Sequence, residues 1–212
     1  MAGQTKPANS LPDLTVRQRL LVRATECFSR KGYASTTVRE IVEAAGVTKP
    51  ALYYYFRNKE GLYLELMQEA WKEFDALLER AQKESGAVRD RIARLLDQAF
   101  SLALDRIEVA RLTYSIYYGP PQGAPFIDFD AFHLKFHEVV KGLVAEGIRK
   151  KEFRKGNLEE MSWLIIGAVN LVIELQICHP EMGVGRPGLA RMIRLIFEGI
   201  AARKQEKKGE WG

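Results

Sequence analysis

The sequence is poor in the side chains that build disulfides, metal clusters and hydrolytic sites. Its 212 residues include two cysteines and three histidines. Cys27 and Cys178 lie far apart in apolar helical patterns, a spacing that suggests neither a disulfide framework nor a zinc site, so we expect buried thiols. The sequence holds no HExxH motif, no Ser-His-Asp order and no phosphate-binding loop. We therefore expect no enzymatic activity.

A leader segment and strand patterns are also missing. The first thirteen residues are polar with two prolines, which predicts neither a signal peptide nor a transit sequence, and hence a cytoplasmic protein. Few runs alternate apolar and polar residues, whereas the i, i+3, i+4, i+7 spacing recurs throughout. Because 47% of the residues are hydrophobic, the chain can bury a core. We predict an all-α protein.

The positive charge is confined to the first part of the chain. Residues 1–60 hold ten Lys or Arg against five Asp or Glu, and residues 61–212 hold twenty-two of each. A local positive field is expected of a surface that meets phosphates, although a solvated basic face would have the same composition.

Two short helices joined by a glycine turn follow the first predicted helix, about 15–31. Thr37-Val-Arg-Glu40 is a capping box that begins one helix, and Gly46 ends it. Thr48 is the predicted N-cap of the next helix, and Pro50 is tolerated in its first turn. This order is the plan of an N-terminal three-helix helix-turn-helix domain, whose last helix enters the major groove of DNA.

Three consecutive tyrosines lie on that last helix, and one helix face cannot bury all three. Leu52 and Phe56 are four residues apart and face the core, with help from Tyr53. An outward tyrosine beside DNA donates its hydroxyl to a phosphate or lays its ring against a sugar or thymine methyl. The alternative is that the tyrosines merely coat a helix surface. The residues expected to point outward are Lys49, Pro50, Ala51, Tyr54 and Tyr55.

Lys59 begins the following helix, where a cation opposes the helix dipole. A bound phosphate would reverse that penalty, so we expect a phosphate site at this helix start and another at Thr37.

Residues 16–62 resemble the DNA-binding domain of the TetR family of bacterial repressors. The resemblance implies a homodimeric repressor on a palindromic operator, released by a small-molecule effector, with no required cofactor. Val42 and Pro50 depart from the family pattern, where smaller residues are commoner, so base readout at Pro50 is in doubt. The residues that carry the resemblance are Ala24, Phe28, Gly32, Tyr33, Thr37, Ile41, Ala45, Gly46, Val47, Lys49, Leu52, Tyr53, Phe56, Lys59 and Leu62. The implied DNA contacts are Thr37, Thr48, Lys49, Pro50, Ala51, Tyr53, Tyr54 and Lys59.

The rest of the chain is predicted to form a larger helical domain for ligand binding and dimerisation. The helix from Lys59 to about Lys83 is long enough to enter it. We expect a flexible arm at 1–13, the DNA-binding domain at 14–60, the second domain at 61–203 and a flexible tail at 204–212.

The helix after Asn157 is apolar nearly all round, so it must be covered on nearly all sides. A membrane span has the same length, but its polar residues Ser162, Asn170, Glu174 and Gln176 are costly in lipid. We therefore predict a homodimer through the last two helices, about 157–180 and 187–203, with no membrane partner.

The effector is expected to be apolar or aromatic. Asn170 and Glu174 lie one turn apart in an apolar helix and serve either the dimer interface, which we favour, or the pocket. The other candidates for the pocket lining are Trp71, Phe74, Phe100, Tyr114, Tyr117, His133, His137 and Trp163. Aromatic residues at this spacing are more often core than ligand contacts.

A metal-responsive regulator is the alternative function. His133 and His137 lie one helical turn apart, and Asp130 lies one turn earlier, so the three share a face. A fourth ligand is not apparent, and solvent-facing or pocket-lining histidines are the favoured interpretation.

Overall fold

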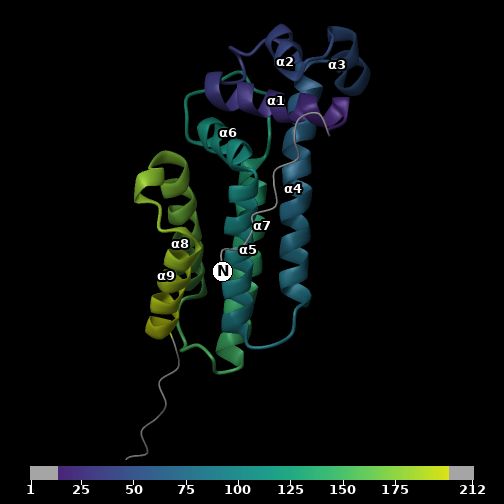
Figure 1. Cartoon of the computed structure of the whole chain (residues 1–212). Helices are drawn as coiled ribbons and strands as arrows, with labels where there is room; N and C mark the ends of the chain where they lie inside the picture. The colour runs from purple at the N-terminus through teal and green to yellow at the C-terminus, as the bar shows by residue number, and fades with distance from the viewer. Residues whose placement is uncertain (1–13, 201–212) are drawn as a thin grey trace, which may run out of the picture. The chain divides into compact units, whose positions relative to one another are not determined.

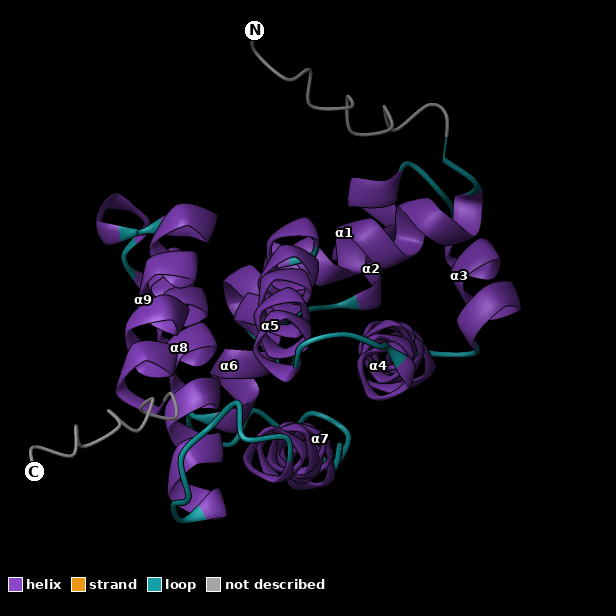
Figure 2. Cartoon of the chain, turned by 90° about the horizontal axis from the view of Figure 1, so that it is seen from below, coloured by secondary structure: helices purple, strands orange, loops and turns teal. Residues whose placement is uncertain are grey.

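The computed structural model describes residues 14–200, and the regular elements in this part of the chain are all helices, with no strand (Figure 2). The all-α prediction is confirmed. The predicted arm 1–13 and tail 204–212 lie outside the described residues. The helices in chain order are α1 Val16–Lys31, α2 Val38–Ala45, α3 Lys49–Phe56, α4 Lys59–Lys83, α5 Val88–Asp105, α6 Ile107–Tyr117, α7 Phe129–Arg149, α8 Leu158–Cys178 and α9 Gly185–Ile200, with a 3-10 turn at Pro180–Met182 before α9 (Figure 1).

The chain divides into two compact units, and the boundary falls inside α4, between Lys72 and Glu73. The first unit contains the N-terminal helices together with residues 106–127. Here α1 packs against α2, α3 and α6. The apolar side chains at helical spacing explain this core, since one stripe of each helix is buried. Its fully buried members include Leu20, Ala24, Phe28, Ile41, Leu52 and Leu62.

Residues 106–127 are fastened to the end of α1 at two places. The Ser29 hydroxyl donates to Glu108 Oε2 at 2.5 Å. The Gln122 side chain accepts a hydrogen bond from the Tyr33 backbone N–H at 3.3 Å and donates one to the Ser115 carbonyl at 3.1 Å. Contacts in the structure therefore group α6 and the loop after it with the N-terminal helices.

The second unit comprises residues 73–105 and 128–200 of the described chain. Within it α8 packs against α5, α7 and α9, and Figure 2 shows α8 and α9 side by side. Its core is a single cluster of apolar side chains from α4, α5, α7, α8 and α9. Arg91 is buried and forms an ion pair with Glu146, a fifth of whose side chain is exposed.

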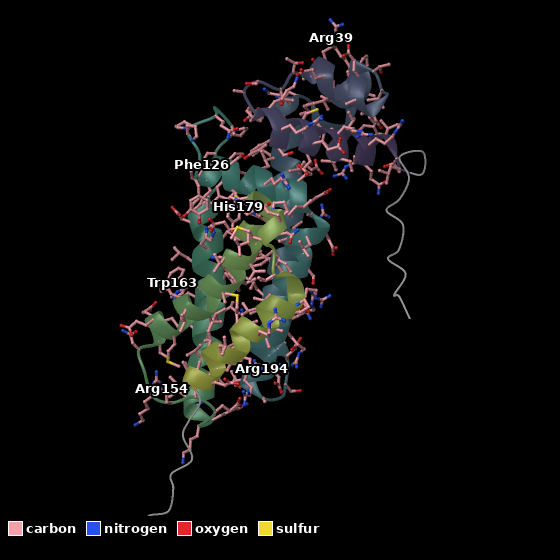
Figure 3. All side chains as sticks on the ribbon, turned by 60° about the vertical axis from the view of Figure 1, so that its left-hand side comes forward. Arg39, Phe126, Arg154, Trp163, His179 and Arg194 are labelled. Atoms are coloured by element: carbon pink, nitrogen blue, oxygen red, sulfur yellow. The ribbon has the colours of Figure 1, made fainter. Side chains whose placement is uncertain are left out.

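Helix α8 has apolar side chains on opposite faces. One face is buried in the second unit, whereas Leu164, Leu171 and Trp163, which is labelled in Figure 3, are exposed. Within the described residues, α8 is also the one helix whose length and composition would suit a membrane span. This is weak support for a span, because core helices pass the same test. Cys178 ends α8 and is exposed, which corrects the expectation of a buried thiol, whereas Cys27 is buried as expected.

Candidate DNA-binding surface

Helix α2 begins at the predicted capping box. The Glu40 backbone N–H donates to Thr37 Oγ1 at 3.2 Å, and Glu40 Oε2 accepts from the Thr37 N–H at 2.9 Å. The Glu40 carboxylate also accepts from Lys31. The Lys31 hydrogen bond, followed by those from Thr37, lowers the pKa of Glu40 from 4.5 to about 2. The start of α2 is thus fixed by a charged network rather than by a single cap.

The turn from α2 to α3 depends on Gly46. Its φ of 63° and ψ of 40° lie in the left-handed region, which glycine enters without a Cβ penalty. The Gly46 N–H bonds the Glu43 carbonyl at 3.2 Å, and the Val47 N–H bonds the Val42 carbonyl at 3.0 Å. These bonds end α2 and form the turn that leads to Thr48, the N-cap of α3, as the predicted helix-turn-helix requires.

Helix α3 presents its tyrosines to solvent. Leu52 and Phe56 are buried, whereas the exposed fractions of the three rings are 48% for Tyr53, 82% for Tyr54 and 41% for Tyr55. The expectation that Tyr53 helps cover the core is therefore wrong, because the core is already closed by Leu52 and Phe56. The Tyr54 and Tyr55 rings pack edge to face at 4.9 Å, which restricts the motion of both.

The remaining residues predicted on α3 lie at its N-terminal end. Lys49 and Pro50 are exposed, and Ala51 is half-buried. Thr48 is the N-cap by backbone conformation, but its hydroxyl makes no capping bond to α3. The hydroxyl is thus not committed to stabilising the helix.

Lys59 has partners that the sequence did not reveal. Its Nζ donates to the carbonyls of Tyr33 and Thr36, each at 2.9 Å, and lies 4.2 Å from the centre of the Tyr33 ring. Burial lowers the pKa of Lys59. These carbonyls explain a cation in the first turn of α4 without the phosphate that the sequence argument required. An ammonium group has three N–H donors, so one is left after these two bonds.

A short connection joins α3 to α4. Only Arg57 and Asn58 separate Phe56 from Lys59. The Asn58 side chain accepts from the Gly61 N–H at 2.7 Å, so it caps α4 as the sequence predicted.

The predicted pocket residues are divided between the two units. Trp71, Tyr114 and Tyr117 belong to the first unit. In the second unit Phe74 and Phe100 are core residues, and the Phe74 ring packs against Phe132 and Phe136 at 4.5 and 5.3 Å. Asn170 is half-buried and Glu174 is exposed, so the expected penalty for burying Glu174 does not arise.

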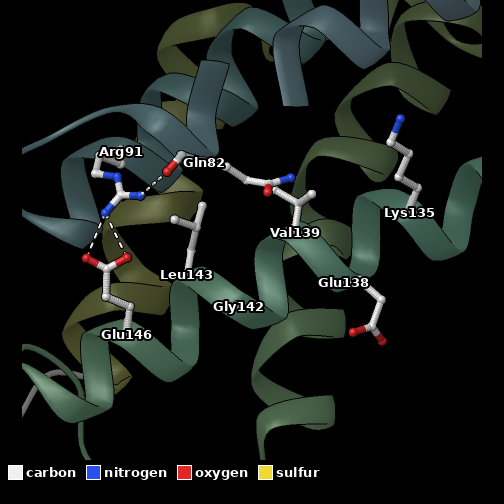
Figure 4. A pocket seen from close by; sticks show the side chains of 8 residues that line it. All are labelled: Gln82, Arg91, Lys135, Glu138, Val139, Gly142, Leu143 and Glu146. Carbon is white, nitrogen blue, oxygen red and sulfur yellow. Dashed lines mark hydrogen bonds and ion pairs between the residues drawn. The ribbon is translucent and has the colours of Figure 1, made fainter. Parts of the chain in front are cut away.

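Two hollows in the second unit are lined by other residues. One, of about 480 Å³, lies between α4 and α5, and one of about 400 Å³ lies where α4, α5 and α7 meet (Figure 4). Sequence reasoning missed both, because their linings mix ordinary apolar and charged residues without a motif. The first is lined by Glu73, Ala76, Leu77, Arg80, Gln98, Ser101, Leu102 and Asp105, and the second by Gln82, Arg91, Lys135, Glu138, Val139, Gly142, Leu143 and Glu146.

The alternative metal site is not assembled. His137 is buried, its ring stacks on Trp163 at 4.1 Å and its Nε2 lies 3.1 Å from Glu159 Oε2. His133 Nδ1 bonds the Phe129 carbonyl at 2.8 Å. Among the described residues no group of three or more His, Cys, Asp or Glu side chains converges, so Asp130, His133 and His137 do not form a metal site. The His133 ring is thus held by the preceding turn of α7, and the His137 ring lies against side chains of α8.

Residues 20–66, from α1 into α4, match the family profile described as bacterial regulatory proteins, tetR family. Over 149 residues the chain is 25% identical to the fatty acid metabolism regulator protein of Bacillus subtilis (strain 168), which covers 65% of this chain and 71% of that protein. It is 32% identical over 95 residues to the transcriptional repressor Rv1474c of Mycobacterium tuberculosis, covering 45% of this chain and 49% of the repressor. The chain thus spans only about half of that second relative.

Solved structures share the fold along most of the chain. The TetR family regulator PfmR of Thermus thermophilus has a TM-score of 0.70 and 22% identity, over 90% of this chain and 100% of that one. The regulator FadR of Bacillus subtilis, solved in complex with stearoyl-CoA, has a TM-score of 0.66 and 20% identity, over 86% of this chain and 98% of that one.

These relatives are transcriptional regulators rather than enzymes. The family profile falls on the helices whose capping box, glycine turn and exposed tyrosines are described above. Residues 20–66 thus match the tetR family of bacterial regulatory proteins, and solved structures of that family share the fold along most of the chain.

Proposed function

We propose that the protein is a cytoplasmic, homodimeric repressor that inserts α3 into the major groove of a palindromic operator and leaves it when a small-molecule effector with an apolar or aromatic part binds. The observation that carries this proposal is the two-sided nature of α3. Leu52 and Phe56 anchor the helix, while three tyrosine rings and Lys49 face solvent. The proposed DNA contacts are Thr37, Thr48, Lys49, Pro50, Ala51, Tyr53, Tyr54, Tyr55 and Lys59.

The contacts divide into positioning and readout. The N-terminal residues of a recognition helix meet base edges, so Lys49 and Ala51 are assigned to readout. Pro50, which has no N–H donor, is assigned to the close approach of the helix to the DNA. Tyr54 is the most exposed ring of α3, and its hydroxyl is assigned to a phosphate. Two N–H groups of the Lys59 ammonium donate to carbonyls. The third N–H is assigned to a second phosphate.

The dimer is proposed to form through α8 and α9. Trp163, Leu164 and Leu171 form an exposed apolar stripe on α8, and Leu195 adds an exposed apolar side chain on α9. Gly167 lies within the stripe with nothing within 4 Å of a Cβ added there, so a second helix has room to approach. Two copies of the chain place two recognition helices on one duplex, whose half-sites recur about every 34–36 Å.

The effector is proposed to be a long-chain acyl thioester. The support is the similarity to the fatty acid metabolism regulator of Bacillus subtilis and to FadR, which was solved with stearoyl-CoA. The 480 Å³ hollow combines Leu77 and Leu102 with polar neighbours, and its size is within the range of ligand pockets. Because α4 runs from one unit into the other, a ligand that tilts α4 changes the separation of the recognition helices.

Selection of duplexes from a random pool by the full-length protein tests the DNA proposal. We expect a short near-palindrome and an affinity that falls steeply with salt, because Lys and Arg contacts release counterions. Ala51→Ser should change the preferred bases, whereas Tyr54→Ala should weaken all duplexes alike. No enrichment at low salt, or identical effects of the two substitutions, would contradict the assignment.

The effector proposal has its own test on the selected duplex. Stearoyl-CoA should release the protein from DNA at concentrations where CoA alone does not. If stearoyl-CoA leaves the complex intact, the acyl thioester is the wrong ligand class. The proposal that the protein binds DNA does not depend on this result.

A further inference from the structure

The turn between α1 and α2 receives contacts from two segments that lead to the second unit. Residues 106–127 are preceded and followed in the chain by that unit, and α4 continues into it. Both segments reach residues 33–36, directly before Thr37, the N-cap of α2.

Gln122 holds the turn from the loop after α6. Its Oε1 accepts from the Tyr33 N–H at 3.3 Å, while its Nε2 donates to the Ser115 carbonyl at 3.1 Å, so one amide joins α6 to the turn. A Cβ on Gly32 would lie 2.7 Å from Gln122 Oε1. Glycine at position 32 is therefore favoured by its φ of 79°, and a Cβ there would displace the Gln122 amide.

Lys59 holds the same turn from α4. Its ammonium group bonds the carbonyls of Tyr33 and Thr36 and lies against the Tyr33 ring. That ring packs edge to face on Tyr63 of α4 at 5.1 Å and lies 5.4 Å from Phe28 of α1. Tyr33 is thus bonded through its N–H to the loop, and through its carbonyl and ring to α4.

Taking the proposed DNA-binding function as given, we infer that Gln122 and Lys59 are positioning residues that fix the start of α2 for operator binding. Residues 33–36 are the joint through which both α4 and the 106–127 segment act on the helix-turn-helix. The operator-binding conformation requires the hydrogen bonds of both residues to this turn. Removing the bonds of either residue lowers the affinity for DNA and leaves the fold of both units intact.

Full-length Gln122→Ala provides the main test, with the duplex that the wild-type protein selects as the probe. We expect the affinity to fall about five- to tenfold, a change that corresponds to about 1–1.4 kcal/mol. The slope of log affinity against log salt should stay at the wild-type value, since Gln122 touches no phosphate. The thermal midpoint should also stay within about 2 °C, because a single part-buried hydrogen bond of 3.3 Å contributes little to global stability.

Amide hydrogen exchange reports the contact directly. The Tyr33 N–H loses its acceptor in Gln122→Ala, so its exchange should accelerate at least about tenfold, whereas amides in α5 should be unchanged. Gln122→Glu keeps the acceptor for Tyr33 and loses the donor to Ser115. It should therefore protect the Tyr33 amide and still bind DNA more weakly.

Two further variants separate positioning from phosphate contact. Lys59→Ala should lower affinity and reduce the salt slope by about 1 if its third N–H meets a phosphate, and Lys59→Arg should recover part of the affinity. The double variant Gln122→Ala with Lys59→Ala should lose less than the product of the single effects, because both residues act on one turn.

Phe126→Ala is the matched control, a larger truncation four residues along the same loop at a side chain that is 86% exposed (Figure 3). The inference is overturned if Gln122→Ala binds within twofold of the wild type, or if Phe126→Ala loses as much. If the wild-type protein selects no duplex, the proposed function fails. In that case, an unchanged hydrogen-exchange rate of the Tyr33 amide in Gln122→Ala would still refute the claim that Gln122 holds residues 33–36.

Discussion

The buried ion pair of the second unit predicts an unequal response to removing its two members (Figure 4). Arg91 is nearly inaccessible, and its Nη1 bonds both carboxylate oxygens of Glu146 at 2.8 Å. Its Nη2 donates to the carbonyls of Ala81 and Gln82 at 3.3 Å, at the end of α4. Glu146 has a second cation, Lys150, at 2.8 Å and keeps a fifth of its side chain exposed. Arg91 therefore depends on Glu146 more than Glu146 depends on Arg91.

The substitution Glu146→Ala leaves a buried guanidinium without its counter-charge. We expect it to lower the free energy of unfolding by about 3–5 kcal/mol, the usual cost of stranding one member of a buried pair. Arg91→Met leaves Glu146 with Lys150 and removes two long bonds to carbonyls, so about 1–2 kcal/mol is expected. Urea unfolding of both variants measures the difference, with Lys150→Met as a control below about 1 kcal/mol because that pair is half-exposed. A loss from Arg91→Met equal to or greater than that from Glu146→Ala would refute this reasoning.

Three further predictions concern the other sites. The folded-state pKa of Glu40 lies below its ordinary value, so its contribution to stability is present above pH 4.5 and is lost as the pH falls toward about 2. The urea midpoint of Glu40→Gln should thus depend less on pH in that window than the wild-type midpoint, and equal slopes would contradict the network. Leu171→Glu should shift the protein to a monomer in sedimentation velocity, because it charges the exposed apolar stripe. Leu134→Glu, at a leucine on α7 that is 58% exposed, should leave a dimer, and a monomeric wild type would refute the interface. Tyr54→Ala should weaken operator binding about tenfold or more with an unchanged thermal midpoint, since its ring is exposed. Tyr54→Phe should show how much of that loss belongs to the hydroxyl. A lowered thermal midpoint in Tyr54→Ala would mean that the ring supports the fold instead.

Local chemistry made the helical plan predictable. The capping box at Thr37 and Glu40 and the left-handed turn at Gly46 depend on residues within a few positions of each other, and the structure has both as expected. The span Lys59–Lys83 followed from Asn58 as a cap and from an unbroken apolar stripe, and α4 has those bounds. Such features are set by the backbone itself, so sequence spacing is enough to find them.

Contacts between distant segments were not predictable in the same way. Lys59 meets carbonyls 23 and 26 residues earlier, and Gln122 meets an N–H 89 residues earlier. Nothing in the spacing of these residues indicates such partners, because they depend on how whole helices pack. The pocket predictions failed to converge for a related reason: an aromatic residue at helical spacing fills a core as well as a ligand site.

The two-residue connection between α3 and α4 leaves almost no slack in the chain. Arg57 adopts a φ of 62°, outside helical values, and Asn58 is already committed to capping α4. A longer linker would absorb a rotation of α4 by adjusting its own torsions, whereas this one passes the rotation on to α3. If the proposed effector acts by moving α4, a variant with a few glycines inserted after Arg57 should respond to it more weakly, and the bonds from Lys59 and Gln122 to residues 33–36 would carry the response that is left.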